Sequence, residues 1–374
     1  MLSADCNSYA KQRFLADQQY QLCLKYAQEL LSSATDRDVE QVLITCILCI
    51  HYETVRGQSK ASRQHMDNGR AIIRQYAYRF RQVSKRSDLA EAQQAFARLD
   101  AAGGSFTDRS TPYMSTLENF YDTAPFLTVW EFSDIYEARN CLFDLSRWLL
   151  LARHQMYYAW QAGEVERFTS YEAEKNIAMA RLKQWHSHFE AMLSQMASRD
   201  EAVVLSLRMW HTALILLSEP DVIGLETRYD QYLDHFECLV GLGERIVELL
   251  SRCEHNNFSY DVGYTTPMFM AAHRCRDPRI RRRAINVLRA VPRQEGNFLS
   301  MPAADVIERL MQYEEGNQTV LTAADAPEDR RVRFISMEFD FDKGNIEAEF
   351  YTLPPGSTEF HVIHEHVHWA PTSG

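Results

Sequence analysis

Apolar residues recur at helical spacing over most of the chain, from residue 11 to about residue 313. Steps of three, four and seven residues place such side chains on one face of an α-helix, and Ser, Asp, Pro and Gly mark its ends. Residues 42–50 are apolar on nearly every side, which indicates a central buried helix. The pattern predicts helices around residues 15–30 and 42–50 and over residues 60–80, 88–101, 134–160, 167–196, 200–218, 226–253, 266–275, 278–291 and 303–313.

The period changes from helical to alternating after a polar segment at residues 323–330. Runs at 332–341, 346–353 and 360–369, separated by turn residues, predict a three-stranded antiparallel meander. Three short strands are marginally stable alone, so the sheet should pack on the helices. We therefore expect an all-α fold, with a large multi-helix globular domain over residues 1–322 and a small C-terminal antiparallel β meander over residues 323–374. No solenoid repeat is found, and residues 102–133 form a long connection between helices.

Composition limits the classes of partner. The net charge of −11 argues against broad adhesion to nucleic acid or to anionic membranes, because such binding needs a basic surface. Neither a leader peptide nor an apolar run of about 18 residues is present, which predicts an intracellular protein, nuclear or cytoplasmic, without a membrane span. The eight scattered cysteines are expected to be free thiols in a reducing compartment.

One short segment reverses the acidic character of the chain. Asp277 and Pro278 suit the start of a helix that ends before Pro292, with an apolar stripe on one side. Arginines crowd its other side and would contact either phosphate groups or an acidic partner, or else pair with carboxylates of this chain, which is the favoured interpretation. The candidate contact residues are Arg279, Arg281, Arg282 and Arg283.

Other motifs point to no catalytic chemistry. Residues 364–368, His-Glu-His-Val-His, match the zinc-peptidase pattern, but on a strand the first and last histidines would lie ~13 Å apart, too far for one zinc ion. Cys46 and Cys49 sit in an apolar helix and are expected to be buried thiols, and the pair Glu314 and Glu315 is expected to be solvated surface. Glycine-rich phosphate loops and nucleophile motifs are missing, so no catalytic residue, metal site or cofactor is predicted.

Residues 261–296 follow the order D-V-G-Y-x-x-P-M-F-x-x-A-x-x-C-R-D-P-x-x-R-R-x-A-I-x-x-L-R-x-x-P-R-x-E-G. Residues 43–53 form an apolar helix followed by His65-x-x-x-Gly69, and residues 327–333 contain P-E-x-x-R-V-R. Together these segments resemble the regulatory, or middle homology, region of fungal binuclear zinc-cluster transcription factors of the type associated with secondary-metabolite gene clusters.

The resemblance implies a helical regulatory domain that controls transcription. Members of that family bind DNA through a six-cysteine zinc cluster, and the cysteines of this chain nowhere have that spacing. We therefore expect no sequence-specific DNA binding by this chain alone, and action through protein partners or a small-molecule effector. Two alternatives stay open: a plain interaction scaffold, and a small-molecule-binding protein or biosynthetic enzyme on a repurposed regulatory scaffold. Its pocket would be lined by aromatic residues such as Trp130, Trp148, Tyr157, Tyr158 and Trp210.

Overall fold

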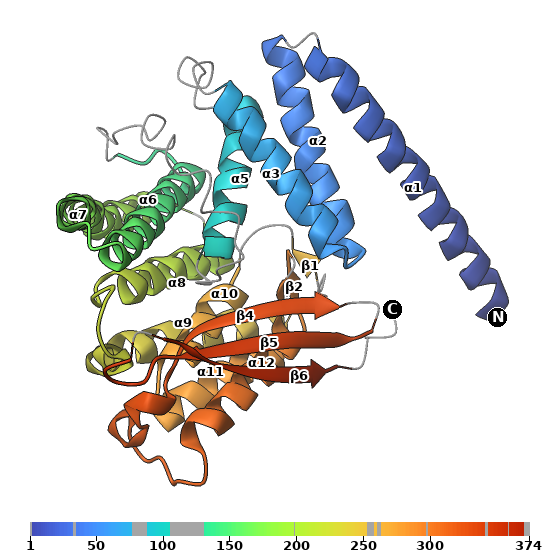
Figure 1. The fold of residues 1–374 in the computed structure, drawn as a ribbon. Coiled ribbons are helices and arrows are strands. Elements are labelled where there is room, and N and C mark those ends of the chain that lie inside the picture. The colour runs from blue at the N-terminus through green and yellow to red at the C-terminus, as the bar shows by residue number, and fades with distance from the viewer. Residues whose placement is uncertain are drawn as a thin grey trace. The chain divides into compact units, whose positions relative to one another are not determined.

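The computed structural model is predominantly helical, with a three-stranded sheet near the C-terminus (Figure 1). Its contacts divide the chain into two compact units, Met1–Phe96 and Ala97–Gly374, and the C-terminal sheet belongs to the second unit. The domain boundary at residue 322 stays a prediction from the sequence. The structure describes residues 2–32, 35–76, 88–104, 131–197, 199–252, 258–259, 263–296, 298–340, 343–357 and 359–369, so most of the predicted 102–133 connection and Trp130 lie outside the described residues.

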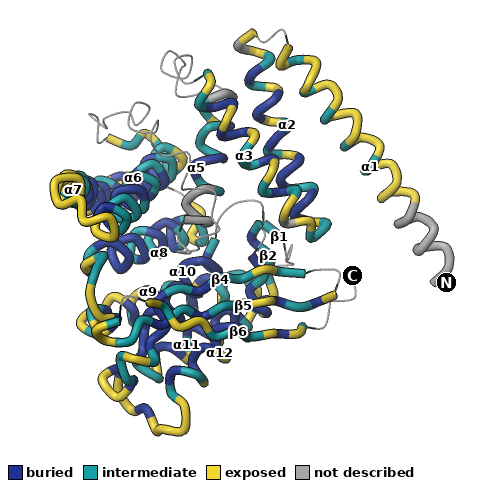
Figure 2. The backbone as a smooth tube through the Cα atoms, viewed as in Figure 1, coloured by how far each residue is buried: buried dark blue, intermediate teal, exposed yellow. Residues whose placement is uncertain are grey.

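The first unit is built around helix α2. The side chain of Thr35 caps its first turn in a capping box with Asp38, and Val42, Leu43 and Ile50 are buried, which confirms the predicted central helix. Helix α1 is exposed along most of its described length (Figure 2). The helices of this unit are α1 (Leu2–Ser32), α2 (Asp36–Val55), α3 (Ser59–Gln75) and the first part of α5 (Asp88–Gly104).

Helices α3 and α5 approach closely at Gly69. A Cβ atom built on Gly69 would lie 2.1 Å from Cζ of Phe96, whose ring is buried. The ring fills the space that any other side chain at position 69 would need. This contact gives the glycine of the His65-x-x-x-Gly69 pattern a packing role.

Replacing Gly69 by alanine is expected to lower the free energy of unfolding by about 1–3 kcal/mol, because the added methyl group overpacks the contact with Phe96. Gly241 lies inside a helix with open space around its Cβ position, so Gly241→Ala is the matched control. It should stabilise the chain by up to about 1 kcal/mol through helix propensity. Chemical denaturation of both variants checks this, and equal stabilisation by the two substitutions would contradict the proposed contact.

The second unit contains two hydrophobic cores that share helix α8. One core gathers Phe143, Trp185 and Trp210, and the other joins the later helices to the C-terminal sheet. Helix α8 is, among the described helices, the one long and apolar enough to span a membrane, but 61% of it is buried inside the protein. The helices of this unit include α6 (Ile135–Gln161), α7 (Val165–Gln195), α8 (Glu201–Ser218), the 3₁₀ helix η3 (Glu226–Tyr232), α9 (Leu233–Leu250), α10 (Thr265–Arg274), α11 (Pro278–Ala290), α12 (Ser300–Glu315) and the short 3₁₀ helices η4 (Ala323–Asp325) and η5 (Glu328–Arg330).

The C-terminal sheet is the predicted antiparallel meander. Strands β4 (Val332–Asp340), β5 (Asn345–Thr352) and β6 (His361–His368) lie in sequence order. Ile346 on β5 pairs with Val367 on β6, and both side chains enter the core shared with α10, α11 and α12. The all-α fold with a C-terminal meander is therefore confirmed.

Two details differ from the sequence prediction. The helix predicted over 226–253 is split, because residues 226–232 form the 3₁₀ helix η3 and α9 begins only at Leu233. A second small sheet joins β1 (Phe258–Ser259), β2 (Gln294–Glu295) and β3 (Phe298–Leu299). Strands of two residues are too short to show an alternating pattern, so the sequence contains no periodic signal for them.

Candidate functional site

The arginine-rich segment lies at the corner between α10 and α11. Asp277 caps α11, since its Oδ1 atom accepts hydrogen bonds from the backbone N–H groups of Arg279 (3.1 Å) and Ile280 (3.0 Å). The predicted apolar stripe of α11 is buried. Arg274, Arg276 and Arg281 are buried as well, so part of the basic segment points into the protein.

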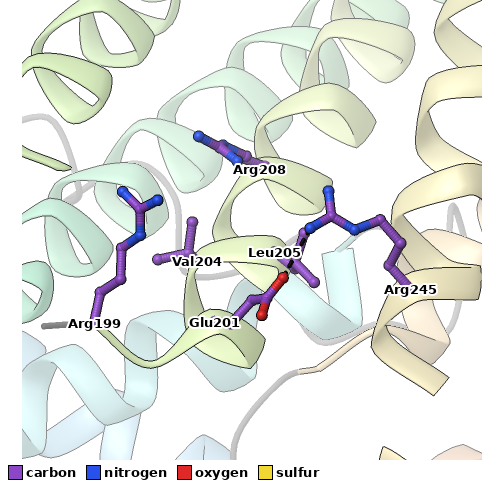
Figure 3. Close-up of a pocket in the computed structure, with 6 residues that line it drawn as sticks. All are labelled: Arg199, Glu201, Val204, Leu205, Arg208 and Arg245. Atoms are coloured by element: carbon purple, nitrogen blue, oxygen red, sulfur yellow. Dashed lines mark hydrogen bonds and ion pairs between the residues drawn. The ribbon is translucent and has the colours of Figure 1, made fainter. Parts of the chain in front are cut away.

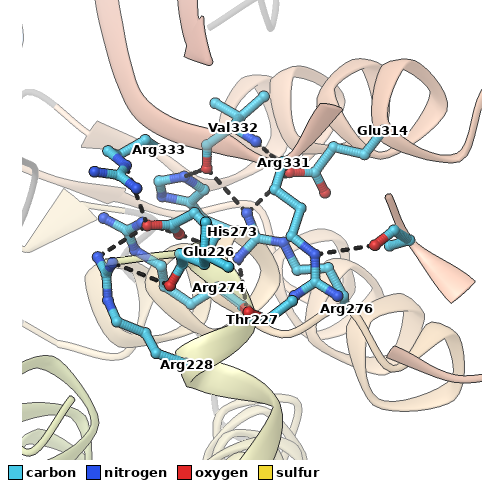
Figure 4. Close-up of polar contacts among 12 residues, drawn as sticks. Glu226, Thr227, Arg228, His273, Arg274, Arg276, Glu314, Arg331, Val332 and Arg333 are labelled. Atoms are coloured by element: carbon cyan, nitrogen blue, oxygen red, sulfur yellow. Dashed lines mark hydrogen bonds and ion pairs between the residues drawn. The ribbon is translucent and has the colours of Figure 1, made fainter. Parts of the chain in front are cut away.

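The first centre of this buried network is Glu226, on η3 (Figure 4). Its carboxylate is 1% exposed and lies 2.6 Å from Arg274 Nη1 and 2.9 Å from Arg228 Nη2. Arg276 Nη1 and Arg333 Nε follow at 3.6 Å and 3.7 Å. One buried carboxylate therefore holds four guanidinium groups from three parts of the chain: η3, the end of α10 and β4.

The second centre is Glu314, in the last turn of α12. Its Oε1 atom accepts hydrogen bonds from Arg276 Nη2 (2.9 Å) and from the backbone N–H of Val332 (2.6 Å). Its Oε2 atom lies 2.7 Å from Arg281 Nη1. Arg276 therefore bridges Glu226 and Glu314, and the carboxylate of Glu314 ties α11 and the start of β4 to α12.

The position of Glu314 corrects the expectation of a solvated Glu314 and Glu315 pair. The side chain of Glu315 is 16% exposed and pairs with Arg282 near the surface, whereas the side chain of Glu314 is 1% exposed. Leu310 and Met311, four and three residues earlier on the same helix, are also buried. Glu314 thus continues the buried face of α12, and its charge is tolerated because Arg276 and Arg281 face it.

Arg331, just before strand β4, links the start of the C-terminal sheet to η3 and to residues 323–326. Its two terminal nitrogens each donate a hydrogen bond of 2.8 Å to the carboxylate of Asp230, a bidentate pair. It also donates to the carbonyl oxygens of Ala323 (2.6 Å) and Ala326 (3.1 Å). We call the whole set the arginine network: Arg228, Arg274, Arg276, Arg281, Arg331, Arg333, Glu226, Asp230 and Glu314.

The network lowers the pKa values of its glutamates. Burial alone would raise the pKa of Glu226, but the charges of Arg274, Arg228 and the other arginines outweigh it and lower the pKa to about 2. Burial likewise opposes ionisation of Glu314, yet Arg276 and Arg281 bring its pKa below the ordinary range. Both carboxylates are therefore ionised at neutral pH and contribute to stability as anions.

Acid should weaken this fold in a defined range. Both glutamates bind fewer protons in the folded state than in the unfolded state, so their stabilisation is complete above the ordinary glutamate pKa of 4.5 and is lost as the pH falls toward 2. Denaturation at a series of pH values should show the free energy of unfolding falling through this range, with a shallower fall in Glu226→Gln. A profile that is identical in wild type and variant would contradict the assignment.

The four arginines singled out from the sequence have different surroundings. Arg279 is 67% exposed and lies 2.9 Å from Glu237, and Arg282 is 48% exposed and lies 2.8 Å from Glu315. Arg283 forms a bidentate pair with Glu244, at 2.8 Å for each nitrogen. Arg281 is buried in the arginine network. All four have carboxylate partners within the chain, and contact of the three accessible ones with an outside partner stays a prediction.

The histidine and cysteine motifs form no metal site in the part of the chain that the structure describes. His364, Glu365 and His368 lie on strand β6, as expected, and not on a helix. Cys46 and Cys49 are buried free thiols, and burial raises their pKa values to about 11 and about 12. The two thiols are therefore protonated at neutral pH.

A cavity of about 260 Å³ opens at the start of α8 (Figure 3). It is not the aromatic pocket suggested by the sequence. The indole of Trp210 is buried and donates a hydrogen bond of 2.9 Å to the carbonyl oxygen of Gly263, and Trp148 packs against the core. The cavity is lined by Arg199, Glu201, Val204, Leu205, Arg208 and Arg245.

Comparison with protein families identifies the class of this fold. The model of the fungal specific transcription factor domain matches residues 3–308, which is most of the chain. The chain belongs to this family and is a transcription-regulator-like protein. No curated protein and no solved structure matches it.

The family match covers only part of the arginine network. Glu226, Arg274 and Arg276 lie within residues 3–308, whereas Glu314 and Arg331 follow after the match. The network thus connects the family domain to the end of α12 and to the sheet. The resemblance of the sequence to fungal regulatory regions is confirmed, and the meander is joined to that domain by buried charges as well as by the hydrophobic core.

Proposed function

We propose that this protein is the regulatory domain of a transcription regulator tied to a fungal secondary-metabolite gene cluster, and that it acts through protein partners or a small-molecule effector in the nucleus or the cytoplasm. The family match over residues 3–308 is the observation that carries the proposal. The order of residues 261–296, which resembles regulators encoded beside such clusters, supports the link to secondary metabolism.

The positions of the arginines also support a role that does not depend on sequence-specific DNA binding by this domain. Proteins that grip DNA need cationic side chains free to meet phosphates. Here Arg274, Arg276 and Arg281 are buried, and Arg279 and Arg282 lie against glutamates of the same chain. This domain is therefore proposed to contact other proteins or an effector instead of a DNA sequence.

Deletion of the coding gene in the fungus, followed by transcript sequencing, tests the proposal. Transcripts of a contiguous set of biosynthetic genes should change, and reintroducing the wild-type gene should restore them. Complementation with Glu315→Gln should succeed and with Glu314→Gln should fail, because only the latter disturbs a buried carboxylate. Unchanged transcripts accompanied by loss of one metabolite would overturn the proposal and favour an enzyme.

A further inference from the structure

We propose that the cavity at the start of α8 binds a small organic anion, in which a carboxylate or phosphate group is joined to an apolar body. The inference names the ligand class of the effector in the proposed function and so rests on that function for its role. The ligand proposal is tested by binding to the purified protein, and the proposed function is tested by transcripts in the fungus. Either proposal can therefore fail while the other stands.

The charge of the cavity favours an anion. Three arginines from different places line it: Arg199 from the segment before α8, Arg208 from α8 and Arg245 from α9. Glu201 is the one carboxylate among the lining residues. Because Glu190 pairs with Arg208 and Glu201 with Arg245, one positive charge remains uncompensated at the cavity, in a chain whose net charge is −11. Convergent guanidinium groups are the usual recognition element for carboxylates and phosphates.

The partners of these arginines show which of them an anion would engage. Glu190 holds Arg208 in a bidentate pair, with hydrogen bonds of 2.8 and 2.6 Å. Arg245 lies 2.8 Å from Glu201, but both side chains are more than half exposed, so this pair is weak and open to competition. Among the described residues, Arg199 donates one long hydrogen bond, 3.4 Å to the carbonyl oxygen of Leu193, and forms no ion pair, although its charge helps to lower the pKa of Glu190.

The arrangement in space agrees with this division. Arg199 and Arg245 stand on either side of Val204 and Leu205, and Arg208 lies beyond them (Figure 3). An anion bound between Arg199 and Arg245 would displace Glu201 from Arg245. Arg208 would keep its bond to Glu190, whose carboxylate offsets its positive charge.

The floor of the cavity explains why the anion should be organic. Val204 and Leu205 of α8 are almost wholly buried in the two hydrophobic cores, so the apolar surface that they present to the cavity is rigid but small. Asp200 already accepts hydrogen bonds from the N–H groups of Ala202 and Val203, so the arginines, and not the helix end, supply the polar contacts. The volume of about 260 Å³ is just under the roughly 300–1,000 Å³ typical of ligand pockets, which fits one ring or a short chain.

Isothermal titration calorimetry with four probes tests the proposal. Benzoate and phenyl phosphate carry both features, inorganic phosphate lacks the apolar body, and benzamide lacks the charge. Saturable 1:1 binding is expected for benzoate or phenyl phosphate, weakening as salt is raised. The relative affinities of these two decide between a carboxylate and a phosphate. The proposal would be overturned if neither benzoate nor phenyl phosphate bound saturably, or if benzamide bound as tightly as they do. An equal affinity for inorganic phosphate would show that the ligand needs no apolar body.

Substitutions place the binding in this cavity. The double variant Arg199→Gln and Arg245→Gln should raise the dissociation constant of the probe by at least about tenfold. Both side chains are exposed, so the melting temperature should stay unchanged. Arg252→Gln is the matched control, because Arg252 is an exposed arginine at the end of α9 that pairs with Glu248 outside the cavity. Equal binding by the double variant and the control would show that the anion binds elsewhere.

Discussion

Glu314→Gln is expected to lower the free energy of unfolding by about 3–5 kcal/mol, the cost of removing one partner from a buried ion pair. The substitution keeps the size of the side chain but leaves Arg276 and Arg281 without their shared anion in a place that water does not reach. The amide oxygen would still accept the N–H of Val332, so most of the loss should come from Arg281, which loses the anion it pairs with, and from Arg276, which keeps only the carboxylate of Glu226 at 3.6 Å.

The adjacent residue provides the control. Glu315→Gln removes a carboxylate from the same helix, but its partner Arg282 is 48% exposed, so the change should stay within about 1 kcal/mol. Chemical denaturation of the two variants under one set of conditions checks the difference. Equal losses would mean that Glu314 is accessible to water in solution, contrary to the structure.

Glu226→Gln is the second large effect, again about 3–5 kcal/mol. Four arginines lie within 3.7 Å of this carboxylate, and none can lose its proton to relieve the mutual repulsion that the substitution leaves behind. The pKa of about 2 for Glu226 points the same way, because it shows that the arginines stabilise the ionised form in spite of burial.

A matched control exists for this substitution as well. Glu248 pairs with Arg252 on the surface of α9, with both side chains more than 60% exposed. Glu248→Gln should change stability by less than about 0.5 kcal/mol. If Glu226→Gln unfolded at the same denaturant concentration as Glu248→Gln, the arginine network would contribute nothing to the fold.

Local signals explain how much of the fold the sequence predicts. Asp277 and Pro278 mark the start of α11, and the helical period and then the alternation of apolar residues define α12 and the strands of the meander. These signals depend on residues close together in the chain, so periodicity detects them. The small sheet of β1, β2 and β3 pairs Phe258 with Gln294, which are far apart in sequence, so no local pattern of residues predicts it.

The sequence favours pairing of the arginines with carboxylates of the same chain, but it does not predict that the arginine network is buried. Charged residues are expected at the surface because of their chemistry, although the spacing of Arg281 and Glu314 indicates the opposite. Arg281 precedes the buried Ala284, Ile285 and Leu288 by three, four and seven residues, which places it on the buried face of α11. Glu314 has the same relation to Leu310 and Met311 on α12. Spacing thus identifies both as buried, but which charge meets which is set by the tertiary fold.

The cavity at the start of α8 could not be predicted from the sequence at all. Arg199, Arg208 and Arg245 come from separate segments, and no motif links them. The aromatic residues that seemed better suited to a pocket, such as Trp210, are used for packing instead. A large apolar side chain at helical spacing indicates burial, and burial in a core is its commonest form.

The central claim is that the basic segment stabilises the domain from within and does not grip an outside polyanion. Modification of the folded protein with phenylglyoxal, which reacts with accessible guanidinium groups, followed by mass spectrometry of the peptides, tests this claim most directly. The structure predicts that Arg279 and Arg282 react while Arg276, Arg281 and Arg331 stay protected until the protein is denatured. Modification of Arg276 and Arg281 in the folded protein at the rate of Arg279 would contradict the account.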